Sequence, residues 1–301
     1  MFTYKIFNNI AEEGLSILKD NRFLNASENP DGLMLRSHKL VKEEFGDSLL
    51  GIARAGAGVN NIPISDATDA GIVVFNTPGA NSNAVKELVI CGMLLSSRGI
   101  IEGINFSKSI EVDNIESFNK ALEAKKKTFA GNELTGKTLG IVGLGSIGSM
   151  LAHAAQTLGM KLIGYDPYIS IDAAWRLPRE VEKAETLEVL LQKSDYVSLH
   201  VPLVQETEDM INAKNIKFFR KGVKLINLSR GGIVNNNDVI KGLESGLISR
   251  FVTDFPTPEL IKRSCEQHDV ILLPHLGAST KEAEINCAVM AANQLSNFLL
   301  N

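Results

Sequence analysis

The stretch Gly143-Leu-Gly-Ser-Ile-Gly148 constrains the fold of this chain more than any other. It follows a short apolar run, residues 139–142, and it precedes apolar or small residues at helical spacing. Glycines at a strand-to-helix turn permit the tight turn, the approach of a pyrophosphate to the backbone and close packing of the helix on the strand. The sequence therefore predicts a dinucleotide site, with an ordinary structural turn as the alternative.

A second apolar run, residues 162–165, ends in Asp166, which lies 18 residues beyond Gly148. An acid at about this distance meets the ribose hydroxyls of a bound dinucleotide. Its carboxylate accepts hydrogen bonds from those hydroxyls and repels a 2′-phosphate, and no arginine follows before Arg176. We therefore predict NAD as the cofactor in preference to NADP.

Length and composition restrict the remaining possibilities. A chain of 301 residues favours two domains, and its net charge of −4 gives no electrostatic reason to expect nucleic acid or an anionic membrane as partner. No signal peptide and no apolar run of membrane-spanning length is present. The three cysteines are far apart, which predicts neither disulfides nor a metal site, and we expect each to be buried. We expect a cytosolic protein.

Strand candidates alternate with helical segments along the whole chain, which predicts α/β architecture with parallel sheets. The first third holds four such strands, at residues 4–7, 33–35, 50–53 and 72–75. Six more follow the glycine-rich stretch, at residues 139–142, 162–165, 196–199, 225–228, 251–253 and 270–273. A complete Rossmann domain, residues 98–279, is therefore expected to be inserted into a smaller flavodoxin-like substrate domain made of residues 1–97 and 280–301.

Chemically active side chains follow the strands of the second domain, at the edge where parallel sheets bind ligands. Arg230 follows the fourth strand, Asp254 and then Glu259 follow the fifth, and His275 follows the sixth. A histidine can exchange the proton of a hydroxyl, a carboxylate can orient that histidine, and a guanidinium can bind a substrate carboxylate. Each residue alone would be assigned a structural or solvated role, as we assign His200. Their common placement predicts hydride transfer at a secondary alcohol.

Four motifs together resemble the D-isomer-specific 2-hydroxyacid dehydrogenase family over nearly the whole chain. They are the glycine-rich stretch with Asp166, His200-Val-Pro-Leu203, Asn227-Leu-Ser-Arg-Gly-Gly-Ile-Val234 and Pro274-His-Leu-Gly-Ala-Ser-Thr280. Arg54-Ala-Gly-Ala-Gly-Val59 and Asn76-Thr-Pro-Gly-Ala-Asn81 are most similar to the branch that acts on a phosphorylated substrate. This resemblance implies NAD-dependent oxidation of 3-phosphoglycerate to 3-phosphohydroxypyruvate, the entry to serine biosynthesis.

The resemblance also implies roles for individual residues. Arg230, Glu259 and His275 match the catalytic residues, and Asp254 matches the aspartate that contacts the nicotinamide carboxamide. The residues that match substrate contacts are Arg36, Arg54, Ala57, Gly58, Val59 and Arg230. Those that match cofactor contacts are Gly143, Gly145, Ser146, Ile147, Gly148, Asp166, Val201, Pro202, Leu228, Ser229, Arg230, Asp254, His275, Gly277 and Ala278.

The sequence departs from the family pattern in three places. Ser146 stands where the family often has arginine, so the cofactor phosphates would depend more on backbone N–H groups. Around the catalytic glutamate the family pattern is Asp-Val-Phe followed by acids and a proline, whereas this chain reads Asp254-Phe-Pro-Thr-Pro-Glu259. Counting five residues on from Asp254 gives Glu259 as the matching carboxylate. The sequence also ends at Asn301, where many relatives continue into a regulatory domain that binds serine, and we expect no such feedback.

Two other functions stay open at this stage. One is a different D-2-hydroxyacid dehydrogenase, such as a glyoxylate or hydroxypyruvate reductase or a D-lactate dehydrogenase. The other is a dinucleotide-sensing protein that acts through partners.

The cluster Lys125-Lys126-Lys127 is interpreted as a solvated helix end, with a phosphate-facing role as the alternative. The resemblance implies a homodimer or a dimer-based tetramer.

Overall fold

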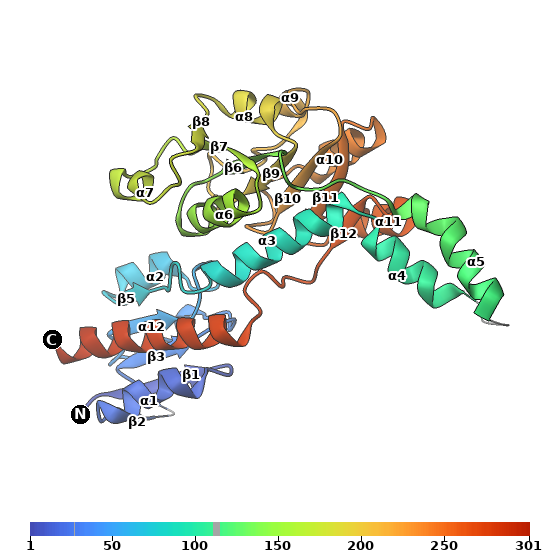
Figure 1. The fold of residues 1–301 in the computed structure, drawn as a ribbon. Coiled ribbons are helices and arrows are strands. Elements are labelled where there is room, and N and C mark those ends of the chain that lie inside the picture. The colour runs from blue at the N-terminus through green and yellow to red at the C-terminus, as the bar shows by residue number, and fades with distance from the viewer. Residues whose placement is uncertain (27, 111–114) are drawn as a thin grey trace. The chain divides into compact units, whose positions relative to one another are not determined.

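The computed structural model describes residues 1–26, 28–110 and 115–301 of the chain. They form two compact units (Figure 1). Unit 1 comprises Met1–Ala84 and Ala278–Asn301, and unit 2 comprises Val85–Gly277. Helix α3 (Ser82–Ser97) begins in unit 1 and continues in unit 2. The limits expected from the sequence for the substrate and NAD-binding domains, 97/98 and 279/280, stay a prediction.

Unit 1 is built on a parallel sheet with the strand order β2-β1-β3-β4-β5. This is the flavodoxin-like order expected for the smaller domain. The predicted count of four strands was wrong, because the two-residue edge strand β2 (Leu24–Asn25) is exposed and has no apolar run. The strands are β1 (Thr3–Phe7), β2 (Leu24–Asn25), β3 (Gly32–Leu35), β4 (Gly51–Arg54) and β5 (Val73–Phe75).

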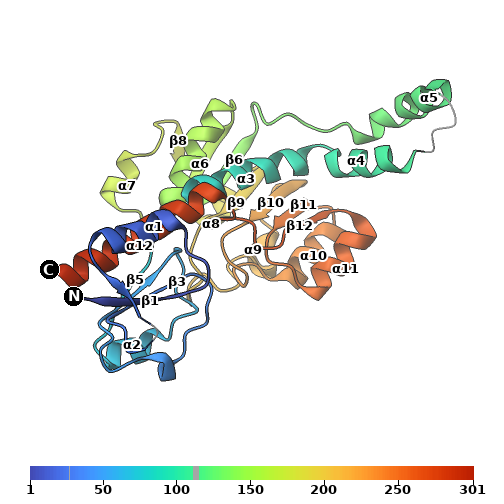
Figure 2. The same ribbon diagram turned by 90° about the horizontal axis from the view of Figure 1, so that it is seen from below.

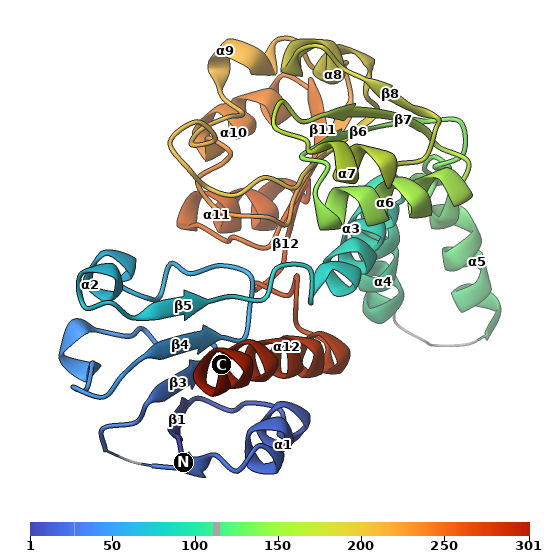
Figure 3. The same ribbon diagram turned by 90° about the vertical axis from the view of Figure 1, so that its left-hand side faces the viewer.

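Helices cover both faces of this sheet (Figure 3). Helices α1 (Glu12–Asp20) and α12 (Lys281–Leu300) pack on one face, and α2 (Ile64–Asp69) packs on the other. The short helix η1 (Lys42–Glu44) lies between β3 and β4 in the chain. The strand residues alternate accordingly, because successive side chains of a strand point to opposite faces. Met34 faces the core beside α1 and α12, whereas Leu33 faces the core beside α2.

Unit 2 is built on a larger parallel sheet with the order β12-β11-β10-β9-β6-β7-β8. Counted from β6 as the first strand, the order runs 3-2-1-4-5-6 as in dinucleotide-binding Rossmann domains, with β12 added at one edge. The strands are β6 (Thr138–Val142), β7 (Lys161–Tyr165), β8 (Val181–Lys183), β9 (Tyr196–Leu199), β10 (Val223–Asn227), β11 (Ile248–Thr253) and β12 (Val270–Leu272).

Strand β8 is absent from the six strands predicted for this domain, so that count was wrong. The strand is only three residues long, Val181-Glu-Lys183, and two of the three are exposed. It pairs with β7 alone, at the edge of the sheet. An edge strand of this kind needs no apolar run, and the sequence therefore carries no hydrophobic signal for it.

Two hydrophobic layers enclose the sheet of unit 2. Helices α3 and α6 (Ser146–Thr157) cover one face, and α8 (Leu187–Lys193) and α10 (Asn236–Glu244) cover the other. Helices α4 (Ile100–Ser109) and α5 (Ile115–Lys125) extend from the sheet as a pair (Figure 2). The remaining helices of the unit are η2 (Lys126–Phe129), α7 (Ile171–Trp175), α9 (Ala213–Ile216) and α11 (Pro258–Gln267).

The three cysteines differ in their exposure to solvent. Cys287 is buried as expected, but Cys91 and Cys265 are exposed, so the expectation of three buried thiols was wrong. Both lie on helices, and the helical pattern around them does not reveal which face meets solvent. Among the described residues, no helix has the length and apolar character needed to cross a membrane.

Candidate active site

The glycines of the turn between β6 and α6 have two kinds of surroundings: two are closely packed, and one faces open space. Gly143 has φ +90°, and a Cβ there would lie 2.6 Å from the carbonyl oxygen of His200. A Cβ on Gly148 would lie 2.1 Å from the carbonyl oxygen of Gly143. A Cβ on Gly145, by contrast, would meet nothing within 4 Å. Gly143 and Gly148 are thus required by packing, while Gly145 leaves the N-terminus of α6 accessible to a pyrophosphate.

Asp166 lies beside this turn at the end of β7. Its Oδ2 accepts a hydrogen bond from the backbone N–H of Leu144 at 2.9 Å, and its Oδ1 accepts one from Tyr168 at 3.0 Å. These two bonds fix the carboxylate against the glycine-rich turn. The turn, the helix N-terminus and the adjacent acid are together the set of groups that a dinucleotide requires.

His200, which follows β9, is held in its neutral form. Its Nε2 lies 2.9 Å from the hydroxyl of Ser198, and its Nδ1 is shut off from solvent without a hydrogen-bond partner. Burial lowers the pKa of this imidazole from 6.5 to about 4. A histidine that stays uncharged at neutral pH suits the structural role predicted for it. Val201 and Pro202 continue the chain from this point.

Asn227 organises the turn after β10, a function that the sequence analysis did not find. Its Oδ1 accepts hydrogen bonds from the N–H and the hydroxyl of Ser229 at 3.2 and 2.9 Å. Its Nδ2 donates to the carbonyl oxygen of Arg230 at 2.8 Å. A buried asparagine at the last position of an apolar strand was the available signal, because such a residue must satisfy its amide locally. The predicted residues Leu228, Ser229 and Arg230 thus form one ordered turn.

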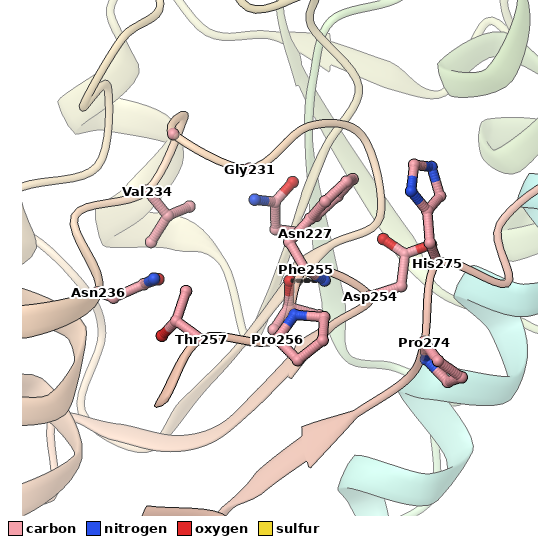
Figure 4. Close-up of a pocket in the computed structure, with 12 residues that line it drawn as sticks. Asn227, Gly231, Val234, Asn236, Asp254, Phe255, Pro256, Thr257, Pro274 and His275 are labelled. Atoms are coloured by element: carbon pink, nitrogen blue, oxygen red, sulfur yellow. Dashed lines mark hydrogen bonds between the residues drawn. The ribbon is translucent and has the colours of Figure 1, made fainter. Parts of the chain in front are cut away.

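Asp254 and His275 come together at the ends of β11 and β12 and line one pocket of about 330 Å³ (Figure 4). The N–H of His275 donates to the carbonyl oxygen of Asp254 at 3.1 Å, and the ring lies edge-on to Phe255 with centroids 5.1 Å apart. The N–H of Gly277 donates to Oδ2 of Asp254 at 2.9 Å. These contacts hold the imidazole at the mouth of the pocket, where its side chain is exposed.

The carboxylate of Asp254 is almost fully buried, and its Oδ1 has no hydrogen-bond partner. Burial raises the pKa of Asp254, and the Gly277 N–H and electrostatic interactions with His275 and Arg230 offset that rise in part. A buried carboxylate oxygen without a donor is costly to maintain. A ligand amide would satisfy it, which fits the carboxamide contact that the sequence resemblance implies for Asp254.

Arg230 and Glu259 are placed differently from His275. The Nη1 of Arg230 donates to the carbonyl oxygen of Ser229 at 2.6 Å, so its guanidinium lies over its own turn. Glu259 is exposed in the first turn of α11 and does not line the pocket. Its pKa is lowered by its own backbone N–H and then by the Thr257 hydroxyl. Within the described parts of the chain, no hydrogen bond joins Glu259 to His275.

In unit 1 the predicted arginines lie at neighbouring strand ends. Leu35, which precedes Arg36, is the register partner of Arg54. Asn61 links the two: its Oδ1 accepts from Nε of Arg54 at 2.8 Å, and its Nδ2 donates to the carbonyl oxygen of Arg36 at 3.2 Å. The guanidinium of Arg54 packs directly on the backbone of Gly56. It therefore lies over the start of the loop that continues through residues 57–59.

Asn76 holds the loop of residues 57–59 from the end of β5. Its Nδ2 donates to the carbonyl oxygen of Ala57 at 2.6 Å. Gly58 and Val59 follow, and their N–H groups are the ones that the resemblance assigns to a carboxylate. Two arginines and a backbone loop at one edge of a sheet form a site suited to an anionic ligand.

The lysine cluster of residues 125–127 lies outside the pocket that Asp254 and His275 line. Lys125, Lys126 and Lys127 are all exposed at the junction of α5 and η2, and Lys126 pairs with Glu123. Among the described residues, no cluster of three histidine, cysteine, aspartate or glutamate side chains is arranged to hold a metal ion.

Comparison with known proteins agrees with this arrangement. Fold and site define a two-unit α/β protein with a dinucleotide-binding Rossmann sheet. Residues 102–277 match the model of the D-isomer specific 2-hydroxyacid dehydrogenase, NAD binding domain. The chain belongs to this family, and NAD is the cofactor of its Rossmann unit.

The most similar relatives include D-3-phosphoglycerate dehydrogenases. That of Synechocystis is 38% identical over 90% of this chain and 47% of its own length, and that of Bacillus subtilis is 32% identical over 99% of this chain and 57% of its own. The chain thus spans about half the length of these relatives. The NAD⁺-bound 3-phosphoglycerate dehydrogenase of Entamoeba histolytica superposes with a TM-score of 0.78, at 26% identity over 100% of this chain and 96% of that one.

Proposed function

We propose that this chain interconverts 3-phosphoglycerate and 3-phosphohydroxypyruvate with NAD(H), the first step of serine biosynthesis. The pair Arg36 and Arg54 is the observation that carries the proposal. Oxidation of a simple 2-hydroxy acid needs one cation for the substrate carboxylate, whereas a phosphorylated one needs additional positive charge. The names of the relatives support this choice of substrate. The cytosolic location and the homodimer or dimer-based tetramer expected from the sequence are part of the proposal.

In the proposed mechanism each residue has one task. NAD, when bound, supplies the hydride acceptor. His275 takes the proton of the 2-hydroxyl as C2 loses its hydride, and returns it in the reverse direction. Arg230 binds the carboxylate and polarises the adjacent carbonyl. Asp254 offers its unpaired Oδ1 to the nicotinamide carboxamide. Arg36, Arg54 and the N–H groups of residues 57–59 bind the anionic groups of the substrate.

Glu259, the proposed catalytic carboxylate, does not line the pocket that holds His275. It lies in the first turn of α11, where its own backbone N–H lowers the pKa of its carboxyl, and orienting His275 would require its side chain to leave that position. The proposal therefore rests on His275 and Arg230 for the chemistry and treats Glu259 as the candidate carboxylate.

The substitution Arg54→Gln tests the need for phosphate recognition. A charge-assisted hydrogen bond contributes about 1.5 to 3 kcal/mol, so the loss should lower kcat/KM for 3-phosphohydroxypyruvate by roughly 10- to 100-fold. The ratio of this kcat/KM to that for hydroxypyruvate, both measured by NADH oxidation, should fall with it. If the ratio stays at its wild-type value, a phosphorylated substrate is the wrong assignment.

A further inference from the structure

The side chain of Arg36 already has an anionic partner. Its Nη1 lies 2.7 Å from Oε1 of Glu284, in the first turn of α12. The two residues are 248 positions apart in sequence, and both belong to unit 1. Their side chains are 39% and 46% exposed, so the ion pair is open to solvent and to ligands. An arginine that would bind a phosphate is thus held by a carboxylate of the same unit.

The helix fixes Glu284 in this position. Thr280 caps α12 through its hydroxyl, which accepts from the N–H of Ala283 at 3.1 Å, and the N–H of Glu284 donates to the carbonyl oxygen of Thr280 at 3.0 Å. Ala288, one turn farther along, packs against Gly14 of α1 so closely that a Cβ on Gly14 would lie 2.6 Å away. The carboxylate is therefore presented from a well-anchored helix.

Glu284 affects a phosphate in two ways. It takes up hydrogen-bonding capacity of Arg36 that a phosphate oxygen would use, and its negative charge repels the phosphate. A solvent-exposed ion pair contributes only about 0 to 1 kcal/mol, so a phosphate can displace the carboxylate. The displacement still reduces the net gain from binding, because the pair must first open.

We propose that Glu284 is a specificity-determining residue of the proposed function: it is an internal counter-ion of Arg36 that the phosphate of the substrate displaces. Glu284 acts through Arg36 and touches no reacting atom, so it is a positioning residue. It keeps the preference for phosphorylated over unphosphorylated 2-oxo acids below the level that Arg36 and Arg54 would otherwise give.

The test compares Glu284→Gln with the matched control Glu282→Gln. Both substitutions remove one negative charge from the exposed first turn of α12, so they change the charge near the helix N-terminus equally. For each variant, kcat and KM are measured for 3-phosphohydroxypyruvate and for hydroxypyruvate. Glu284→Gln should raise the ratio of the two kcat/KM values by roughly two- to fivefold, through a lower KM for the phosphorylated substrate. Glu282→Gln should leave that ratio unchanged.

A double-mutant cycle shows whether the effect passes through Arg36. In an Arg36→Gln background, Glu284→Gln should no longer raise the ratio. Isothermal titration of the NADH-bound protein with 3-phosphoglycerate gives a second readout, and Glu284→Gln should bind it more tightly by a similar factor.

The possible failures are distinguishable. If the wild-type protein does not turn over 3-phosphohydroxypyruvate, the proposed function itself is wrong. If the wild type does so and Arg36→Gln lowers the ratio, but Glu284→Gln leaves it unchanged or lowers it, the function stands and the role of Glu284 is refuted. An equal rise for Glu282→Gln would also refute it, because that result would reflect the general charge of the helix.

Discussion

His275 is one of six non-glycine residues among those described that have a positive φ, here +55°. Backbone in this left-handed region is uncommon for a side-chain-bearing residue, and it persists where surrounding contacts determine it. At His275 those contacts are the bonds from its N–H to the carbonyl oxygens of Asp254 and Leu273 and the edge contact with Phe255. The residue proposed to transfer the proton is thus positioned mainly through its backbone.

His200 carries a prediction about acid stability. Its pKa is about 4 in the folded state against 6.5 for a free histidine, so as pH falls the unfolded chain binds a proton first. The stability contributed by neutral His200 is therefore complete above pH 6.5 and is lost progressively between 6.5 and about 4. Within that window the free energy of unfolding falls by about 1.4 kcal/mol at most for each pH unit.

Urea unfolding at pH 7.5 and pH 5.0 measures this effect. Between these two pH values the free energy of unfolding should fall by about 1 to 2 kcal/mol more for the wild type than for His200→Gln, because only the wild type has this histidine. If the free energy of unfolding falls equally for the wild type and His200→Gln between the two pH values, the assignment of a neutral His200 is contradicted.

At the scale of single elements, the turn from β6 into α6 separates a packing glycine from a ligand-facing one. Gly148→Ala places a Cβ 2.1 Å from a backbone oxygen, and it should destabilise unit 2 by about 1 to 3 kcal/mol. Gly145→Ala meets no neighbouring atom at an ordinary φ of −69°, so the free energy of unfolding should change by less than about 1 kcal/mol.

Cofactor binding should rank the same two variants in the reverse order. Gly145→Ala should weaken NADH binding more than Gly148→Ala does. NADH titration followed by fluorescence should show binding weakened about tenfold or more by Gly145→Ala, because its Cβ occupies space that a pyrophosphate approaches. If Gly145→Ala binds NADH as tightly as the wild type does, the assignment of this turn to the pyrophosphate fails. A fully stable Gly148→Ala would contradict the packing argument.

The elements that the sequence predicted are those with a strong local signal. Buried strands such as β6 and β9 are mainly apolar, and the glycine-rich turn has a fixed spacing. Strand β8 could not be predicted, because an exposed three-residue edge strand has neither feature. Asn61 and Glu284 were missed for a different reason. Their contacts with Arg36 span 25 and 248 residues, and only the folded chain brings them together.

At the scale of the whole molecule, two parallel sheets of different strand order present two sets of polar groups at their strand ends. Unit 1 carries Arg54 and also Arg36, which pairs with Glu284. Unit 2 contributes the dinucleotide-binding turn, Asp254 and His275. Family membership establishes the NAD-binding class, and the positive charge in unit 1 supports a phosphorylated substrate within that class.

The most direct test of this account is a side-by-side assay of the purified protein with four 2-oxo acids. NADH oxidation is followed with 3-phosphohydroxypyruvate, hydroxypyruvate, glyoxylate and pyruvate under identical conditions. We predict that kcat/KM is highest for 3-phosphohydroxypyruvate, by about tenfold or more, since the phosphate adds charge-assisted hydrogen bonds. An equal or higher kcat/KM for any of the three unphosphorylated acids would contradict the account.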